Sequence, residues 1–334
     1  MTTADEEAEG GTGTKSGSRS MTRWILLAGL GAVAGVSAVL CAGLGPSGVV
    51  FPWETLGETA SLIFHEIRLP RVLVAILVGM GLAVAGAAMQ GLFRNPLADP
   101  YVLGTSAGGA LGAAVAILFL GGSYVPVLAF CGACGSIFTV YLIARQGTRA
   151  SVEILLLSGV AVSFFLSAML SFLMYRAGQN LHQIIYWLMG GLWNADWNSV
   201  STGCLIIPGV IVLVLAGREL DILSLGEEEA STLGVDTERV KLLLLAVSAF
   251  VTAIAVSIAG SIGFIGLITP HLVRSFTGPQ HRSLIPVAAL TGGLILLWTD
   301  TISRTYLSDL PVGIITAFFG APFFLYLVRR RLSG

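Results

Sequence analysis

Few side chains in the long apolar segments of this sequence could do chemistry. Asp300 and Arg304 lie four residues apart toward one end of such a segment, and opposite charges at this spacing can pair on one face of a helix. His271 follows Pro270 in a short segment, where a lone histidine packs more often than it binds a ligand. Proton relays need ionisable groups deep in a membrane, and most of these segments contain none. The sequence therefore predicts neither proton-coupled transport nor a catalytic centre.

Two cysteines, Cys131 and Cys134, have the Cys-x-x-Cys spacing that can serve metal binding or redox chemistry. They lie in an apolar segment without a second pair or a nearby histidine, so we interpret them as small residues at a helix contact. The sequence has two lysines, Lys15 and Lys241, and neither lies in a nucleotide-binding loop. We therefore expect a transport subunit that is no enzyme and binds no cofactor. Any ATP and Mg²⁺ would be bound by a partner ATPase.

The composition indicates a membrane protein. Apolar residues make up 55% of the 334 residues and charged residues 11%, whereas a soluble domain has about 25% charged residues. Lipid can cover a surface so poor in charge, and the 42 glycines suit closely packed membrane helices. The net charge of −1 and the lack of a basic patch argue against nucleic acid as a partner. The fold class expected is an all-α polytopic membrane protein.

Hydropathy divides the chain into a tail and a membrane domain. Residues 1–22 are acidic and then rich in Gly, Ser and Thr, which predicts a disordered cytoplasmic tail. A membrane helix needs about 20 apolar residues, and residues 23–331 contain about ten candidates. The eighth is short and contains Pro270, so we expect a broken helix whose freed backbone groups are covered by protein or a water-filled cavity. The ten predicted spans are 24–45, 70–92, 102–121, 124–144, 152–175, 199–217, 240–259, 262–276, 284–304 and 311–328.

Basic residues predict the orientation, because they are enriched on the cytoplasmic side of a membrane. With both termini in the cytoplasm, fourteen of the 18 basic residues lie inside. These are Lys15, Arg19, Arg23, Arg94, Arg145, Arg149, Arg218, Arg239, Lys241, Arg274, Arg282, Arg329, Arg330 and Arg331. The four on the outer side are Arg68, Arg71, Arg176 and Arg304. Arg68, Arg71 and Arg304 lie at the outer ends of spans, where they could either anchor at the lipid headgroups or receive an acidic partner.

Two inner loops could serve transport. The loop at 218–239, the coupling loop, predicts a short helix over 227–233 with Ser224 or a neighbour as its cap and Gly234 at its end. Such a helix could dock into a groove on a partner, or the loop could be a surface hairpin without a partner. The second loop, 94–100, contains two prolines that stiffen it. Its Asn95 and Leu97 could close a pore from below, or the loop could be only a turn.

Seven motifs follow one another between about residues 50 and 330, in the order in which they occur in one family of membrane proteins. They are Arg-Leu-Pro-Arg at 68–71, Gln90 followed by Asn-Pro-Leu-Ala-Asp-Pro at 95–100, Leu-Gly-Thr-Ser-Ala-Gly at 103–108, Tyr-Trp-Leu-Met-Gly-Gly at 186–191, Gly-Phe-Ile-Gly-Leu-Ile-Thr-Pro-His-Leu-Val-Arg at 263–274, Leu-Pro-Val-Gly-Ile-Ile-Thr-Ala at 310–317 and Gly-Ala-Pro-Phe-Phe at 320–324. In these motifs the sequence resembles the FecCD family of permeases, which includes importers of vitamin B12, haem and ferric siderophores. The acidic tail has no counterpart in the family pattern.

The resemblance implies the type II ABC importer permease fold in the cell membrane. It implies two permease subunits, here a homodimer, with two ATP-binding cassette ATPases below and an extracytoplasmic substrate-binding protein above. By the same resemblance, Arg68, Arg71 and Arg304 dock the binding protein, while Asn95 and Leu97 form an inner gate. The residues matched to the ATPase contact are Gly226, Glu227, Glu228, Glu229, Ala230, Leu233 and Gly234.

The cargo is less well defined by the sequence. Ferric siderophore is the expected cargo because such systems are common in the family, and cobalamin and haem stay open. The motif at 186–191 resembles the cobalamin branch. An ion-coupled secondary transporter is an alternative, but it would need an intramembrane carboxylate or ion site. An intramembrane enzyme would need a buried catalytic group.

Overall fold

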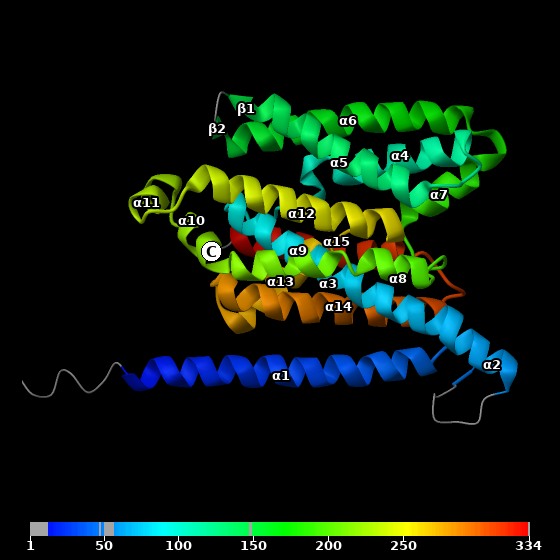
Figure 1. Ribbon diagram of the computed structural model, residues 1–334, viewed down its shortest axis with the longest axis horizontal. Coiled ribbons are helices and arrows are strands. Elements are labelled where there is room, and N and C mark those ends of the chain that lie inside the picture. The colour runs from blue at the N-terminus through cyan, green and yellow to red at the C-terminus, as the bar shows by residue number, and fades with distance from the viewer. Residues whose placement is uncertain (1–12, 47, 50–56, 147–148, 333–334) are drawn as a thin grey trace, which may run out of the picture.

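The computed structural model describes residues 13–46, 48–49, 57–146 and 149–332, which form one bundle of nearly parallel helices (Figure 1). Within the described residues, seven helices are long and apolar enough to cross a membrane. The α-helices are α1 Gly13–Gly43, α2 Glu58–Leu62, α3 Leu69–Leu92, α4 Thr105–Phe119, α5 Val125–Ala144, α6 Val152–Arg176, α7 Leu181–Met189, α8 Trp197–Gly203, α9 Ile206–Leu215, α10 Gly217–Leu223, α11 Glu227–Thr232, α12 Thr237–Ala259, α13 Ile265–Thr277, α14 His281–Tyr306 and α15 Val312–Leu332. A π-helix, η1 Ile63–Arg68, joins α2 to α3, and two short 3₁₀-helices are η2 Pro100–Leu103 and η3 Gly178–Asn180. Strands β1 Arg145–Gln146 and β2 Arg149–Ala150 pair antiparallel.

The ten predicted spans coincide with helices, and the all-helical membrane fold is confirmed. The sixth span is divided into α8 and α9, and the short α7 was not predicted. Helix α1 begins at Gly13, so it includes part of the segment predicted as a disordered tail; residues 1–12 lie outside the described residues. Extending a helix is far less costly than nucleating one, and the membrane span supplies the nucleus. We call the end with α10 and α11 the inner end, following the predicted orientation, and the opposite end the outer end.

Helix α3 lies at the centre of the bundle and depends on glycine for its close contacts. A Cβ atom on Gly79 would collide with the carbonyl oxygen of Gly292 on α14. A Cβ atom on Gly86 would collide with the carbonyl oxygen of Gly266 at the start of α13. Small residues allow backbones to approach in this way in membranes, where helix association depends on packing. The α3–α14 pair therefore forms a rigid centre that reaches from the inner to the outer end.

The eighth span is not broken at Pro270, because α13 is continuous from Ile265 to Thr277 with Pro270 inside it; the non-helical backbone lies instead at the junction between α12 and α13. Gly260 has φ of 67°, which turns the chain after α12. The carbonyl of Ala259 accepts the N–H of Gly191 at 2.9 Å, and the carbonyl of Ile262 accepts the hydroxyl of Tyr101 at 2.9 Å. Gln90 Nε2 donates to the carbonyl of Leu267 at 3.1 Å. Protein groups therefore satisfy this break, as non-helical backbone in a membrane requires.

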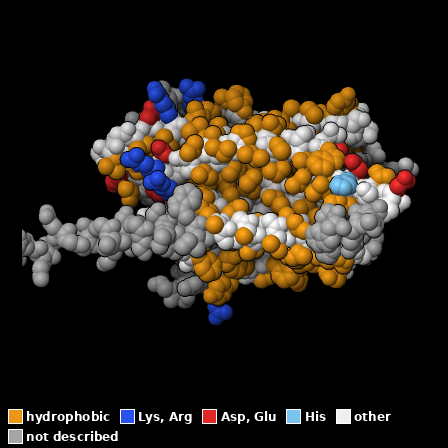
Figure 2. Space-filling view, turned by 60° about the horizontal axis from the view of Figure 1, so that its bottom comes forward, with side chains coloured by type: hydrophobic (Ala, Val, Ile, Leu, Met, Phe, Trp, Pro, Cys, Tyr) orange, Lys and Arg blue, Asp and Glu red, His pale blue; other side chains and the backbone are white. Residues whose placement is uncertain are grey.

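The sides of the bundle are apolar along their middle, and charged residues lie toward its two ends. Figure 2 shows hydrophobic side chains over most of one face, with Lys and Arg gathered at the end that carries α10 and α11. Large side chains such as Phe164, Phe318 and Tyr175 are exposed. A soluble protein rarely exposes an apolar surface of this extent. The surface fits a lipid bilayer.

Candidate functional site

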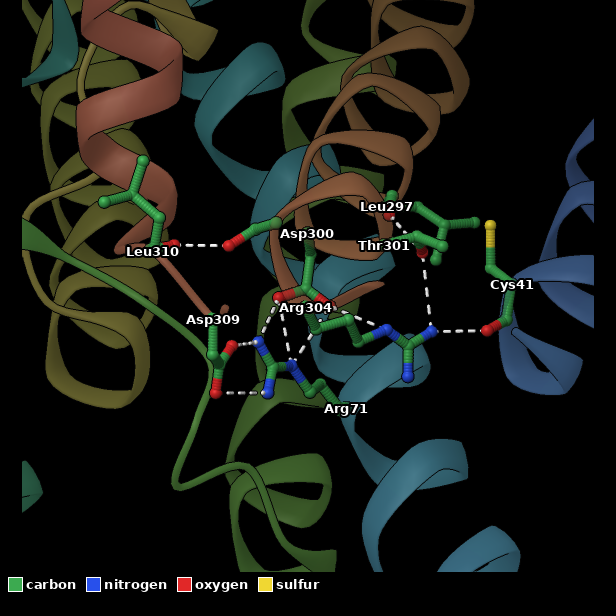
Figure 3. Close-up of polar contacts among 9 residues, drawn as sticks. Cys41, Arg71, Leu297, Asp300, Thr301, Arg304, Asp309 and Leu310 are labelled. Carbon is green, nitrogen blue, oxygen red and sulfur yellow. Dashed lines mark hydrogen bonds and ion pairs between the residues drawn. The ribbon is translucent and has the colours of Figure 1, made fainter. Parts of the chain in front are cut away.

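An ion cluster joins three elements at the outer end of the bundle (Figure 3). Arg71 on α3 points at Asp300 on α14, and its Nε and Nη2 donate to Asp300 Oδ1 at 3.0 and 2.9 Å. The same guanidinium donates to Asp309, which precedes α15, at 2.5 Å from Nη2 and 3.3 Å from Nη1. Arg304 Nε lies 3.7 Å from Asp300 Oδ2. We call Arg71, Asp300, Arg304 and Asp309 the outer cluster.

The other two predicted docking arginines, Arg68 and Arg304, donate to backbone carbonyls. Arg68 ends the π-helix η1 and donates to the carbonyls of Gly43 at 2.7 Å and Gly48 at 3.2 Å. Gly45 lies against the Arg68 guanidinium so closely that a Cβ atom there would overlap it. Arg304 Nη2 donates to the carbonyl of Cys41 on α1. Both arginines therefore tie the end of α1 to the bundle.

The structure brings the three predicted docking arginines to one end of the molecule and buries them. Arg68, Arg71 and Arg304 are 3%, 7% and 5% exposed. The side chain of Asp309 is 43% exposed, whereas that of Asp300 is fully buried. The exposed group of the outer cluster is therefore an acid, not the ring of cations that the sequence suggested. The docking role itself stays a prediction.

Burial of these arginines sharpens the charge asymmetry of the surface. Of the four predicted outer arginines, Arg176 alone is exposed. At the inner end, the exposed basic residues among those described are Arg94, Arg145, Arg218, Arg239, Arg282 and Arg329. A cytoplasmic excess of exposed Lys and Arg is the pattern expected for a protein oriented with α10 and α11 inside.

The predicted inner gate lies in a tightly bonded turn. Asn95 accepts the N–H of Leu97 through Oδ1 at 3.0 Å, and its carbonyl accepts the N–H of Ala98 at 3.0 Å. Asp99 caps η2 by accepting the N–H of Tyr101 at 2.8 Å. Burial raises the pKa of Asp99 to about 6, and the bond from Tyr101 opposes this rise. The rigid turn that the two prolines predicted is present, while closure of a pore by Asn95 and Leu97 stays a prediction.

The coupling loop contains the short helix predicted from its sequence. Helix α11 covers Glu227–Thr232, and its cap position is Gly226, with φ of 145°, not Ser224. Ala230 is buried, whereas Leu225 and Leu233 are 64% and 63% exposed. Ala230 therefore packs into the bundle, whereas Leu225 and Leu233 do not. Two leucines stay at the surface, where a partner could bind them.

An ion pair holds α11 against α12. The side chain of Lys241 is nearly buried, and its Nζ lies 3.0 Å from Glu227 Oε2 on α11. It also lies 2.5 Å from Glu238 Oε1 on its own helix. Glu228 and Glu229 are exposed on the same short helix. Glu227 thus has a structural role, whereas Glu228 and Glu229 face solvent.

Sequence reasoning missed the contact that ties the coupling loop to the core. Asp221 on α10 accepts the N–H of His281 at 2.6 Å and its ring Nδ1 at 2.9 Å. Burial acts to raise the pKa of Asp221, but the His281 ring and backbone bonds outweigh it and lower that pKa below its ordinary value. His281 begins α14 and lies against Gly91 at the end of α3. The coupling loop therefore rests on the inner ends of the same two helices that carry the outer cluster.

Metal binding finds no support in the part of the chain that the structure describes. Among those residues, no group of three or more His, Cys, Asp or Glu side chains could hold a metal ion. Cys131 is exposed and Cys134 half-buried on α5.

Comparison with known proteins identifies the family. The model of the FecCD transport family matches residues 25–330. This chain belongs to the FecCD transport family. The permease is 50% identical over 277 residues to the cobalamin import system permease protein BtuC of Halobacterium salinarum, covering 82% of this chain and 75% of the relative. It is 42% identical over 292 residues to the hemin transport system permease protein of Yersinia pestis, covering 84% and 87%.

Solved structures agree with this assignment. The permease matches a structure described as a metal-chelate type ABC transporter in an inward-facing conformation, with a TM-score of 0.83 and 34% identity over 91% of this chain and 98% of that one. A complex called PsaBC from Streptococcus pneumoniae shares the fold at a TM-score of 0.52 and 19% identity, covering 78% and 90%. The chain is thus an integral membrane protein and an ABC importer permease.

Proposed function

We propose that this permease imports a bulky metal chelate, with cobalamin as the first candidate. The 50% identity to a cobalamin permease over 82% of this chain supports that cargo most directly. Haem is the second candidate, because a hemin permease is 42% identical over 84% of the chain. The relatives described above are named for cobalamin and hemin, so ferric siderophore, the cargo expected from the sequence, becomes the third candidate.

The nearly uncharged interior fits the passage of a bulky cargo. The charged side chains of the outer cluster and of the coupling loop lie at the two ends of the bundle. Between them, the bundle exposes apolar side chains such as Phe164 on α6 and Phe318 on α15. A wall of this kind offers no group that would hold a chelate tightly. Cargo selection then belongs to the extracytoplasmic binding protein.

The partners follow from the two ends of the molecule. An ATPase subunit would bind the coupling loop through the exposed Leu225 and Leu233, with Glu228 and Glu229 beside them. The binding protein would present carboxylates to Arg68, Arg71 and Arg304, and Asn95 and Leu97 would form the inner gate. A second copy of the chain would cover the exposed apolar side chains of α6 and α15. Both termini would lie in the cytoplasm.

An uptake assay tests the proposed cargo. The permease is reconstituted into proteoliposomes with its ATPase and binding protein, and uptake of labelled cobalamin, haem and a ferric siderophore is compared. We expect ATP-dependent uptake of cobalamin to exceed that of the other two. Uptake of haem or of the siderophore in preference to cobalamin would overturn the cargo and leave the importer assignment standing. The control is the double variant Glu228→Arg with Glu229→Arg in the coupling loop, which should no longer bind the ATPase.

A further inference from the structure

The outer cluster contains a carboxylate in the position that a docking partner would need. Arg71 is anchored on one side by Asp300, which is fully buried. On its other side the guanidinium binds Asp309, whose side chain is 43% exposed. An acidic side chain arriving from outside would reach Arg71 from the side that Asp309 now occupies. The site is therefore filled from within the chain.

Charge balance makes Asp309 a competitor for any incoming acid. The outer cluster has two arginines and two aspartates, so it is neutral while Asp309 is in place. Withdrawal of Asp309 leaves one net positive charge on partly desolvated arginines, where Coulomb interactions are strong. A carboxylate from a partner restores neutrality. Exchange of one carboxylate for another is thus favoured over binding beside Asp309.

The backbone at Asp309 is suited to release. Ser308 and Asp309 have φ of 52° and 61°, in the left-handed region that a serine rarely adopts and an aspartate tolerates better. Asp309 N–H donates to the carbonyl of Ser303 at 3.2 Å. The pair with Arg71 thus helps to hold a strained turn. Loss of that pair would loosen the turn, which Ser303 also holds by accepting the N–H groups of Leu307 and Asp309 and donating to the carbonyl of Leu310.

The turn leads directly into α15. Val312 begins this helix three residues after Asp309, and Gly313 N–H donates to the carbonyl of Gly190 at 3.2 Å. Further along, α15 exposes Phe318, Phe319 and Leu325. One side of the helix therefore packs against its own chain, and the opposite side is left for lipid or a second copy. A change at Asp309 has a direct path to a membrane-spanning helix.

We propose that Asp309 is an internal substitute for the binding protein's carboxylate, and that docking replaces it on Arg71 and releases the turn before α15. This inference rests on the proposed docking function. It assigns to Asp309 a role opposite to that of the arginines, because removing its charge should strengthen docking.

The test compares the affinity of the purified binding protein for permease variants in lipid nanodiscs. Asp309→Asn keeps the shape of the side chain, and asparagine tolerates the left-handed conformation. We expect this variant to lower the Kd of the binding protein on the order of threefold to tenfold, and the tenfold limit corresponds to about 1.4 kcal/mol of binding free energy. Arg71→Gln should raise Kd by at least as much. Glu66→Gln, which removes an exposed acid from η1, controls for the general loss of negative charge.

Each outcome decides a separate point. Tighter binding by Asp309→Asn with little change for Glu66→Gln supports the exchange. Equal tightening by both variants, or unchanged or weaker binding by Asp309→Asn, overturns it. Unchanged affinity of Arg71→Gln overturns the docking role of Arg71, and the exchange with it. Labelling of Arg71 by phenylglyoxal, read by mass spectrometry, should be faster in Asp309→Asn and suppressed by the binding protein; equal labelling with and without Asp309 also contradicts the exchange.

Discussion

Neutralising Asp300 should destabilise the permease far more than neutralising Asp309. Asp300 is fully buried and accepts three hydrogen bonds from Arg71, at 3.0, 3.1 and 2.9 Å. Arg304 lies 3.7 Å from the same carboxylate. Asp300→Asn would leave both arginines without their buried anion. Breaking a buried ion pair from one side costs about 3–5 kcal/mol, and two cations share this partner.

Asp309 provides the matched comparison within the same cluster. Its side chain is 43% exposed, so water replaces much of the lost interaction, and Asp309→Asn should cost about 1 kcal/mol or less. The assay is the free energy of unfolding of each variant in mixed detergent micelles. A double variant, Arg71→Met with Asp300→Leu, should recover part of the loss, because it removes the buried charges of that pair but leaves the buried Arg304 without its anion. A cost below about 1 kcal/mol for Asp300→Asn, equal to that of Asp309→Asn, would refute this account of the cluster.

Three further predictions concern the rest of the bundle. Gly86→Ala should lower the melting temperature strongly because its Cβ atom would collide with backbone, while Gly135→Ala, with open space around it, should change it little. Asp221→Ala should cost about 1–3 kcal/mol of unfolding free energy and speed hydrogen exchange at the start of α14, because it removes the acceptor for His281. Between pH 5 and pH 8 the wild type should lose up to about 1.4 kcal/mol of unfolding free energy that Asp99→Asn keeps, because this window crosses about one unit below the raised pKa of about 6; the melting temperatures of the two proteins measure the difference.

The sign of the pH effect follows from the direction of the pKa shift. Burial raises the pKa of Asp99 to about 6, so between its ordinary value and about 6 the folded chain holds a proton that the unfolded chain has released. Wild-type stability therefore falls as the pH rises through this range, and asparagine removes that loss. Equal pH dependence of the wild type and Asp99→Asn would contradict the assignment. Equal melting temperatures of Gly86→Ala and Gly135→Ala would contradict the prediction on helix packing. Unchanged hydrogen exchange at the start of α14 in Asp221→Ala would contradict the prediction on His281.

Hydropathy predicted the spans well because membrane burial is a property of each segment by itself. Length and composition were sufficient for helices such as α6 and α12. Helix α7 was missed because Leu181–Met189 is too short to cross a membrane. The short eighth span was predicted from its length, but Pro270 misplaced its break: α13 continues through this proline, and the non-helical backbone lies before the helix. The groups that cover this backbone come from distant parts of the chain.

The outer cluster shows what local spacing cannot reveal. The i, i+4 spacing predicted that Asp300 pairs with Arg304, and the two do approach within 3.7 Å. The shorter pair joins Asp300 to Arg71, which is 229 residues away in sequence. Such a contact depends on the packing of α3 against α14, which no single segment encodes. The same holds for Asp221 and His281, 60 residues apart.

The source of energy for transport provides the most direct test of the whole account. The permease is reconstituted alone and with its ATPase and binding protein, and cobalamin uptake is measured with ATP inside, with a proton gradient, and with neither. We predict uphill uptake only when the ATPase, the binding protein and ATP are all present, and no effect of a protonophore. Uphill uptake by the permease alone, driven by an ion gradient, would contradict the account.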